Sequence, residues 1–197
     1  MHDFEKIKRY VLKKLEKGLP SYLTYHNISH TLDVLKQSLI IAREEGIDDP
    51  EAIFLLKVGS IYHDTGFEFV YSGHEEKGCE IVQRELPNFH FSSAQIESIC
   101  GLIMATKIPQ SPKNYLEEII CDADLDYLGR SDFYPIGEGL YKEFLYQGIV
   151  SDEKSWNELQ VRFLESHHYF TKACKRKREA TKQRHLDEIK ASLKLVS

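Results

Sequence analysis

The sequence predicts an all-α fold, a compact helical bundle of about nine or ten helices that forms a single domain over residues 1–197. Three observations support this fold class. Apolar residues recur with the helical period of about 3.6 in nearly every segment and almost never alternate with the strand period of two. The 11 glycines and 6 prolines are few, and they fall where the apolar segments end. A chain of this length also buries a substantial core without disulfide bonds.

The individual helices follow from the apolar stripes and from polar residues that can cap them. Asp49-Pro50 is typical of a helix start, with an N-cap residue followed by proline at the first helical position. Ser72 with Glu75, and Ser92 with Gln95, have the spacing of a capping box. The helical segments expected in chain order are 4–18, 30–46, 50–63, 72–86, 92–103, 111–129, 140–148 and, as the C-terminal helices that complete the fold, 151–197, opened by Ser151.

The amino-acid composition predicts a soluble globular protein without a membrane span. Hydrophobic residues make up 42% and charged residues 29% of the chain, as in ordinary soluble globular proteins. No window approaches 18 consecutive apolar residues, so we expect no membrane span. Lys and Glu occur throughout the first twenty residues, so we expect no signal peptide. Four cysteines without a CxxC pair fit a reducing, cytoplasmic compartment.

The charge is uneven along the chain. The net charge of −5 argues against a dedicated nucleic-acid-binding protein. Residues 172–184, however, contain seven basic residues against Glu179 alone, a net charge of +6, so the rest of the chain carries −11. The favoured interpretation is the solvated face of a long C-terminal helix. The alternative is a cationic surface that attracts a phosphorylated substrate, with Lys172 and Arg176 as the best candidates for phosphate contacts.

Histidine residues occur in two places where they could share a site. His26 and His30 are four residues apart, so on a helix both imidazoles would lie on one face. His63 and Asp64 are adjacent at the end of an apolar helix, where each is costly to bury unless it is paired or bound to a metal. The structural alternative is a helix end at which Asp64 accepts hydrogen bonds from local amides and His63 packs in the core.

A third group is a run in which aspartate occupies every second position. Asp124 lies one turn after Ile120 and one turn before Leu128, so its side chain is expected to point inward, where a carboxylate needs a cation. The alternative is a partly exposed helix end with Asp126 pointing outward, and Asp122 is expected to be a partly exposed residue of this kind.

The combined pattern is His, His-Asp and Asp on three helices. Two imidazoles and two carboxylates suit a borderline divalent ion better than calcium, which prefers oxygen ligands alone. We therefore expect one divalent metal ion: Mn, Fe, Co, Ni, Zn or Mg. Four protein ligands leave one or two octahedral positions for water, and metal-bound water loses a proton far more easily than bulk water. This is the equipment of a metal-assisted hydrolase.

Residues 26–124 contain this pattern as an ordered H…HD…D series. The residues that carry it are Tyr25-His26-Asn27, His30-Thr31, Asp33-Val34, His63-Asp64 and Asp122-Ala123-Asp124. The series resembles the HD-domain superfamily of metal-dependent phosphohydrolases, which includes cyclic-nucleotide phosphodiesterases, (p)ppGpp hydrolases and deoxynucleotidases. The resemblance implies an all-α fold and a metal ion bound by His30, His63, Asp64 and Asp124.

The resemblance also implies an activity: hydrolysis of a phosphomonoester or phosphodiester, with a nucleotide as the small-molecule substrate. A metal-bound water is then the nucleophile, and Asp64 bridges or orients it. The YHNxxH stretch is similar to that of cyclic-nucleotide phosphodiesterases, in which the first His protonates the leaving oxygen. That role falls on His26 here.

Three further residues bear on the site. Glu68 lies four residues after Asp64, where an acid assists the attacking water in some relatives; the alternative is a solvated loop residue. His74 is similar to a histidine that many HD proteins place before their next helix, and it is a candidate for substrate contact or a second metal; the alternative is helix capping. Thr106 stands where a relative often has histidine, which favours one metal over two.

Three alternatives to a hydrolase are weighed. A metal-dependent oxygenase of the same superfamily needs two irons, and Thr106 argues against it. A non-catalytic HD-fold module would bind a nucleotide or act as a sensor, but it has no need of four costly polar core residues. Nucleic-acid binding through residues 172–184 would be sensitive to salt, and we expect it to be absent.

Overall fold

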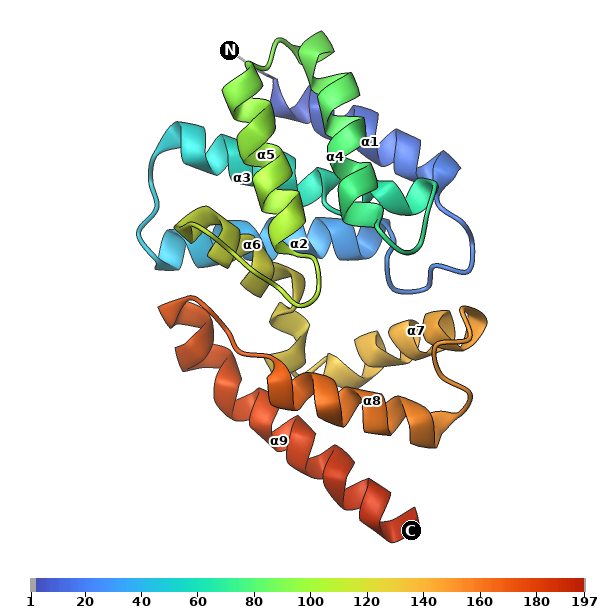
Figure 1. Ribbon diagram of the computed structural model, residues 1–197. Coiled ribbons are helices and arrows are strands. Elements are labelled where there is room, and N and C mark those ends of the chain that lie inside the picture. The colour runs from blue at the N-terminus through green and yellow to red at the C-terminus, as the bar shows by residue number, and fades with distance from the viewer. Residues whose placement is uncertain (1–2, 197) are drawn as a thin grey trace. The chain divides into compact units, whose positions relative to one another are not determined.

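The structure, a computed structural model, describes residues 3–196 and consists of helices joined by loops (Figure 1). Over these residues there are nine α-helices, three short 3-10 helices and no strand. The prediction of an all-α fold with nine or ten helices is therefore confirmed. The α-helices are α1 (Phe4–Gly18), α2 (Ile28–Glu44), α3 (Pro50–Tyr62), α4 (His74–Glu85), α5 (Ser93–Ala105), α6 (Tyr115–Asp124), α7 (Phe133–Tyr146), α8 (Glu153–Ser166) and α9 (Lys172–Val196), and the 3-10 helices are η1 (Thr65–Glu68), η2 (Leu86–Phe89) and η3 (Asp126–Gly129).

The chain forms two compact units, each of which is described by itself. Within the described residues, the first unit contains 3–21 and 26–124, and the second contains 22–25 and 125–196. A single domain over residues 1–197 stays a prediction. None of the helices between residues 3 and 196 combines the length and the apolar character that crossing a bilayer requires.

The core of the first unit lies among α1, α3, α4 and α5. α3 packs against α1, α2 and α5, and α4 packs against α5 and η1. α1 contributes one apolar stripe, Ile7, Val11 and Leu15, whose members are at most 1% exposed. The other buried residues of this core are Leu35, Val58, Ile61, Tyr62, Ile81, Val82, Leu86, Phe91, Ile99 and Ile103. This packing fixes the end of α3, from which the His63-Asp64 pair extends.

Two of the predicted helix caps are confirmed. Oδ2 of Asp49 accepts a hydrogen bond from the N–H of Ala52 at 2.7 Å, and Pro50 is the first residue of α3. Ser92 and Gln95 form a reciprocal capping box at the start of α5. These short-range signals are local hydrogen bonds, which is why the sequence alone identifies them.

The capping box predicted for Ser72 and Glu75 is wrong. α4 begins at His74, after Gly73, whose φ of 77° lies in the left-handed region that glycine adopts without strain. Glu75 is buried, and its Oε1 lies 3.5 Å from Nε2 of His74. A glycine turn, rather than a serine cap, therefore leads into α4.

The helix predicted over residues 111–129 is shorter than expected. α6 begins at Tyr115, and the side-chain oxygen of Asn114 caps its first turn. It ends at Asp124, and Leu125 adopts a non-helical conformation with φ −106° and ψ 15° before η3 begins. Asp124 is therefore the last residue of its helix rather than an interior one.

The second unit is built from η3, α7, α8 and α9. α9 packs against α8 and η3, and α7 packs against η3. α8 begins at Glu153, and its cap is Asp152, one residue after Ser151, which was expected to open this segment. The buried apolar residues of this core are Tyr25, Leu125, Tyr127, Leu128, Phe133, Leu164, Leu186 and Ile189.

The basic stretch 172–184 lies on α9. Its interpretation as a solvated helix face is confirmed for five exposed residues, Lys172, Lys175, Arg176, Lys177 and Arg184. Arg178 instead donates two hydrogen bonds, at 2.7 and 2.9 Å, to the carboxylate of Asp126. Lys182 is buried and donates to the carbonyl of His167 at 2.6 Å. Asp126 is 1% exposed, so it does not point outward as the alternative required.

Gly66, in η1, touches the first residue of α4. A Cβ atom on Gly66 would lie 1.9 Å from the carbonyl oxygen of His74, closer than non-bonded atoms can approach. The missing side chain therefore lets η1, which directly follows the His63-Asp64 pair, pack against the backbone of α4.

We predict that Gly66→Ala lowers the free energy of unfolding by about 2 kcal/mol or more, because the backbone of α4 has to move away. Gly78→Ala is the matched control: a Cβ there comes no closer than 3.4 Å to Ile103, and alanine is favoured over glycine in a helix by about 1 kcal/mol. Chemical denaturation measures both variants. Equal stabilities for the two would contradict the close-contact explanation.

Candidate metal centre

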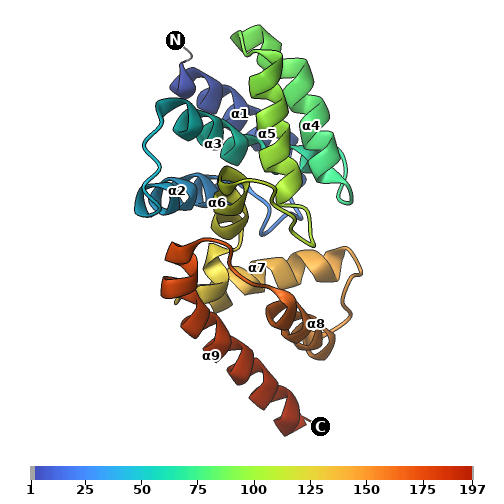
Figure 2. The ribbon, with the colours of Figure 1, turned by 60° about the vertical axis from the view of Figure 1, so that its left-hand side comes forward.

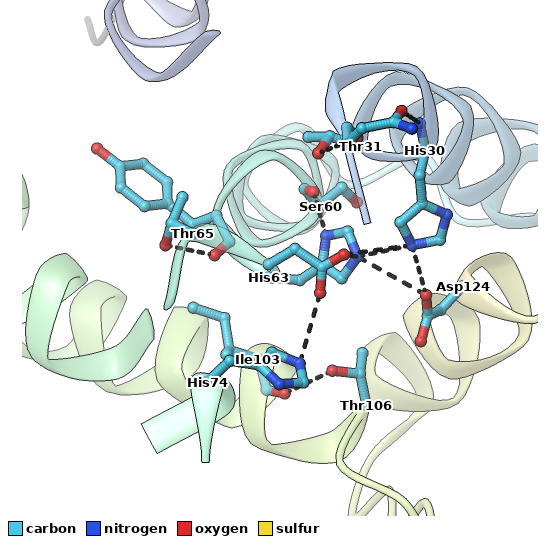
Figure 3. Close-up of polar contacts among 12 residues, drawn as sticks. His30, Thr31, Ser60, His63, Thr65, His74, Ile103, Thr106 and Asp124 are labelled. Atoms are coloured by element: carbon cyan, nitrogen blue, oxygen red, sulfur yellow. Dashed lines mark hydrogen bonds and ion pairs between the residues drawn. The ribbon is translucent and has the colours of Figure 1, made fainter. Parts of the chain in front are cut away.

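Three segments of the first unit converge on one point (Figure 3). His30 lies in the first turn of α2, His63 and Asp64 directly follow α3, and Asp124 ends α6. α2 packs against both α3 and α6, which brings these distant parts of the chain together. The start of α2 is fixed by Asn27, whose Oδ1 accepts a hydrogen bond from the N–H of His30 at 3.3 Å. The packing and the cap together place His30 opposite the ends of α3 and α6.

The nitrogen and oxygen atoms of these four residues lie close to one another. The Nε2 atoms of His30 and His63 are 3.3 Å apart. Oδ1 of Asp124 lies 3.1 Å from Nε2 of His30 and 3.7 Å from that of His63. Oδ2 of Asp64 lies 3.4 Å and 3.1 Å from the same two nitrogens. Each carboxylate therefore contacts the same pair of ring nitrogens.

In this arrangement, ring nitrogens and carboxylate oxygens that carry lone pairs face one another. Nδ1 of His63 lies 2.8 Å from the carbonyl oxygen of Ser60, to which it donates its hydrogen. In the neutral ring, Nε2 of His63 then carries a lone pair that faces the centre. Oδ2 of Asp64 is buried and has no hydrogen-bond partner among the described residues. A cation among these atoms would satisfy all of them at once.

The spacing suits a small divalent cation. Metal–ligand bonds of about 2.0–2.2 Å place neighbouring ligand atoms about 3.0–3.6 Å apart in octahedral or tetrahedral geometry. The measured separations between imidazole nitrogens and carboxylate oxygens are 3.1 to 3.7 Å. His30, His63 and Asp124 each place one ligand atom within 4.8 Å of the other two. His30, His63 and Asp124 could therefore hold the predicted divalent ion, and Asp64, whose Oδ2 lies near both nitrogens, is the candidate fourth ligand.

Electrostatics favour a cation in the same place. Burial raises the pKa of each carboxyl, but the adjacent histidines outweigh it: they hold the pKa of Asp64 well below its usual range and lower the pKa of Asp124 to about 2. Burial lowers the pKa of His63, yet the two carboxylates raise it well above its ordinary value. Without metal the cluster holds a proton, and a divalent ion competes with that proton for the same lone pairs.

A stack of rings lines one side of the centre. The ring of Phe67 stacks on the imidazoles of both His26 and His74, at centroid distances of 4.3 and 3.7 Å. Nδ1 of His74 donates to the carbonyl of Tyr71 at 3.1 Å, and its Nε2 lies 3.6 Å from Oδ1 of Asp64. The structure thus brings His26 and His74 to the edge of the centre, where both contact one phenyl ring and their own centroids are 6.1 Å apart.

Phe67 and Tyr71 were not among the residues singled out from the sequence. Tyr71 packs edge-on against Phe67, with ring centroids 5.3 Å apart. The available signal was local: Phe67 is an aromatic residue three positions after Asp64, in the turn that continues from the His-Asp pair. Its periodicity marks it only as apolar, so the sequence did not reveal that two histidines stack on it.

His26 does not share a helix with His30, which corrects the expectation that both lie on one helical face. α2 begins at Ile28 with Asn27 as its N-cap, so His26 precedes the helix. The two imidazoles still approach each other, with centroids 5.9 Å apart and planes at 86°. Capping by Asn27 therefore sets the position of His26 in the preceding loop.

Glu68 is not brought to the centre. Its Oε1 lies 3.7 Å from Nζ of Lys14 on α1, and the same lysine donates to Glu85 at 2.8 Å. Oε1 of Glu68 is buried and has no hydrogen-bond partner among the described residues. Burial raises the pKa of Glu68; Lys14 opposes this and Glu85 adds to it. The catalytic role of Glu68 stays a prediction that no contact supports.

Within the described part of the chain, the other residues singled out from the sequence do not contribute side chains to this cluster. Asp122 is 0% exposed, so its expected place at a partly exposed helix end is wrong; α2, α3 and α5 all pack against α6. Thr106 is buried and its hydroxyl donates to the carbonyl of Ile103 at 2.8 Å, so it offers no ring nitrogen to a second metal. Lys172 and Arg176 belong to the second unit, and their phosphate contacts stay predictions.

Three helices that bring His, His-Asp and Asp to one cation site define a class of all-α metal-binding proteins. The chain belongs to the HD domain family: the family model for the HD domain matches residues 27–127, just over half of the chain. The matched segment contains all four candidate ligand positions and leaves out α1, His26 and α7 to α9.

A solved structure extends the likeness of fold over nearly the whole chain. It is that of a protein described as a predicted HD superfamily hydrolase from an uncultured Thermotogales bacterium, with 18% sequence identity and a TM-score of 0.61. The similarity covers 96% of this chain and 92% of the other. At this level of identity the likeness concerns the fold. A comparison with curated protein sequences gives no match.

We predict that His30→Ala and Asp124→Ala each abolish stoichiometric metal binding. Loss of a residue that only supports a ligand typically weakens metal binding about 10–100-fold. Loss of a ligand itself should weaken it by more. Elemental analysis of the purified protein measures the metal content, and circular dichroism checks the fold. His90→Asn is the control, because His90 is exposed in the same unit and asparagine tolerates its φ of 64°. Retention of a full metal equivalent in both alanine variants would disprove the centre.

We predict that Glu68→Gln raises the thermal midpoint of unfolding at pH 7.5 and leaves it unchanged at pH 4. The raised pKa of Glu68 means that the folded state disfavours its charged form. Its contribution to stability is therefore fully present below the unfolded pKa, and is lost as the pH rises through the folded pKa. Glutamine removes this loss, and Lys14 keeps Glu85 as its partner. A lower midpoint at pH 7.5 would contradict the prediction, and a loss of activity in a folded variant would support the catalytic role instead.

Proposed function

We propose that the protein is a metal-dependent phosphohydrolase that cleaves a phosphomonoester or phosphodiester, with a small nucleotide as substrate. One observation carries this proposal: two imidazole nitrogens and two ionised carboxylates meet at one largely buried point. Membership of the HD family supports it, and so does the likeness to a protein described as a HD superfamily hydrolase. The nucleotide substrate rests on the YHNxxH stretch that includes His26 and His30.

His30, His63, Asp64 and Asp124 would hold the metal ion. When bound, a divalent ion supplies Lewis acidity, which makes water a better nucleophile near neutral pH and reduces charge at a phosphoryl group. Two ionised aspartates balance a charge of +2, so the site does not repel an anionic ester. Asp64 is also the candidate for orienting the attacking water, because its Oδ1 lies on the side of His74 rather than between the two ligand histidines.

His26 is the candidate proton donor to the leaving oxygen. Its ring stacks on Phe67 at 4.3 Å and stands beside His30, so packing rather than ligation orients it. A group placed next to a ligand can reach the leaving oxygen while the ligands hold the phosphoryl side. His74, which also stacks on Phe67, is the candidate for contact with the substrate.

One further observation separates the proposal from a two-metal oxygenase. Thr106 places a hydroxyl, already engaged with the carbonyl of Ile103, at the position where a second metal would need a ring nitrogen. A hydrolytic centre with one metal needs no such nitrogen. A non-catalytic nucleotide sensor would use the same four ligands, and turnover distinguishes the two.

We predict that His26→Ala keeps its metal and loses turnover. For a nucleotide ester with a poor leaving group, the rate should fall by about 10²–10⁴-fold, the usual contribution of a general acid. For p-nitrophenyl phosphate esters, whose leaving group needs no proton, the loss should be much smaller. Metal content and steady-state kinetics on both substrate types measure this. Loss of metal in His26→Ala would show that His26 is a ligand instead.

The same assay tests the activity itself. Metal-loaded protein is offered a panel of nucleoside monophosphates, cyclic nucleotides and nucleoside triphosphates, and released phosphate or nucleoside is measured. Turnover that disappears in His30→Ala supports the hydrolase. Stoichiometric metal with no turnover, together with saturable nucleotide binding, would overturn it in favour of the sensor module.

A further inference from the structure

Two of the four cysteines face each other where α4 packs against α5. Figure 2 shows these two helices side by side, as Figure 1 does. Sγ of Cys79 on α4 donates to the carbonyl oxygen of Cys100 on α5 at 3.6 Å, and Sγ of Cys100 lies 3.9 Å from the carbonyl oxygen of Cys79. Each sulfur therefore reaches the backbone of the other residue, so the two side chains point toward one another across the helix interface.

The two helices approach closely at this level. Gly78, which directly precedes Cys79, is buried. A Cβ atom on Gly78 would already lie 3.4 Å from Cγ2 of Ile103 on α5, so a longer side chain has no room there. A disulfide bond requires Cα atoms about 4.4–6.8 Å apart and side chains that point toward each other. The glycine and the reciprocal sulfur contacts favour such a bond without a rearrangement of either helix.

Solvent reaches this pair of cysteines more readily than the other two. Cys79 and Cys100 are both half-buried, whereas Cys121 and Cys174 are buried. Cys121 also donates to the carbonyl oxygen of Ala105 at 3.0 Å, and Cys174 belongs to the second unit. Susceptibility of a cysteine to oxidation follows its exposure and its thiolate character. A small oxidant dissolved in water would therefore meet Cys79 and Cys100 first.

The two facing thiols differ in acidity. The hydrogen bond between them is the main cause that raises the pKa of the Cys79 thiol and lowers the pKa of the Cys100 thiol. Burial adds to the rise at Cys79 and opposes the fall at Cys100. The thiolate is the nucleophilic form of cysteine. Cys100 is therefore suited to attack an oxidant, and Cys79 is suited to react in a second step.

We propose that Cys79 and Cys100 form a redox-sensitive dithiol, which hydrogen peroxide converts to a disulfide bond between α4 and α5. The thiolate of Cys100 attacks one peroxide oxygen, the O–O bond breaks, hydroxide leaves, and Cys100 becomes a sulfenic acid. The sulfur of Cys79 then attacks the sulfenic sulfur, the S–O bond breaks, and the oxygen leaves as water with the proton of Cys79. Overall, the two thiols lose two electrons and two protons, and one peroxide is reduced to two molecules of water.

The bond would hold together an element that lies next to the metal centre. It closes the stretch 79–100, which contains the rest of α4, η2 and the first part of α5. α4 begins at His74, against whose backbone Gly66 packs. None of the four candidate metal ligands lies on α4 or α5. The dithiol is therefore independent of the proposed phosphohydrolase activity, and either proposal can fail without the other.

Peptide mapping tests the bond directly. The full chain is reduced, freed of reductant and treated with a small excess of hydrogen peroxide under native conditions, and remaining thiols are blocked with N-ethylmaleimide. Trypsin cuts after Lys77, Arg84 and Lys107, so residues 78–84 and 85–107 form separate peptides, with one cysteine each. We expect mass spectrometry to find these peptides joined, two hydrogen atoms lighter than their sum, in a chain that stays monomeric on a non-reducing gel. Dithiothreitol should separate them.

Thermal unfolding measures the consequence of the bond. Peroxide should raise the midpoint of unfolding by about 5 °C or more, because a closed loop restricts the unfolded chain, and dithiothreitol should restore the starting value. Cys79→Ala and Cys100→Ala should each abolish the joined peptides and the shift. Cys174→Ala is the matched control, because it removes a buried thiol of the second unit, and it should show the full shift.

Dithiothreitol also distinguishes the bond from other oxidation, because it does not reverse methionine sulfoxide or sulfinic acid. Three results would overturn the proposal: the two peptides stay unlinked, the link joins two chains, or Cys79→Ala shows the same reversible shift as the unaltered protein. Circular dichroism shows whether each variant is folded. If an alanine variant does not fold, the peptide map of the unaltered protein decides.

Discussion

Two imidazole nitrogens facing each other between two carboxylates impose the main constraint on the first unit. Without a cation, the lone pair of His63 and the buried oxygen of Asp64 are left unsatisfied or must share a proton. With one, each atom would gain a partner at a bond length that the separations already allow. Folding of this unit and binding of a metal would then be thermodynamically linked, since a site of this kind does not exist in the unfolded chain.

The helices make this unfavourable juxtaposition possible because each candidate ligand lies at or next to a helix end. A helix end carries backbone groups without intrahelical partners, and side chains there can be oriented by bonding to them. Asn27 caps the turn that presents His30, and Gly66 allows the segment after Asp64 to press against α4. The ring of Phe67 then orients two further histidines by stacking. Local backbone features and packing between distant segments together determine where these rings point.

The fold class and the residues of the candidate metal centre could be predicted from the sequence. The helical period identified the all-α fold, and four polar residues at buried positions identified the cluster, because a buried charge has few explanations. The predictions that were not confirmed concern residues whose positions depend on contacts with distant parts of the chain, which no local sequence pattern encodes. Glu68 turns to Lys14, 54 residues earlier in the chain, and Asp126 is buried by Arg178, 52 residues later. His26 precedes α2 because Asn27 takes the cap position. The role of Phe67 depends on stacking with His26, 41 residues earlier in the chain, which no local pattern predicts.

The end of α3 has a geometric consequence of its own. The carbonyl of Ser60 accepts from His63, and that of Tyr62 accepts from the hydroxyl of Thr65 at 2.8 Å, so the last turn directs the residues that follow it. The other end of this helix is fixed by Pro50. Inserting or deleting one residue between the two ends would rotate the His-Asp pair by about 100° around the helix axis. The number of residues in α3, and not only their identity, sets the direction of the His63 and Asp64 side chains.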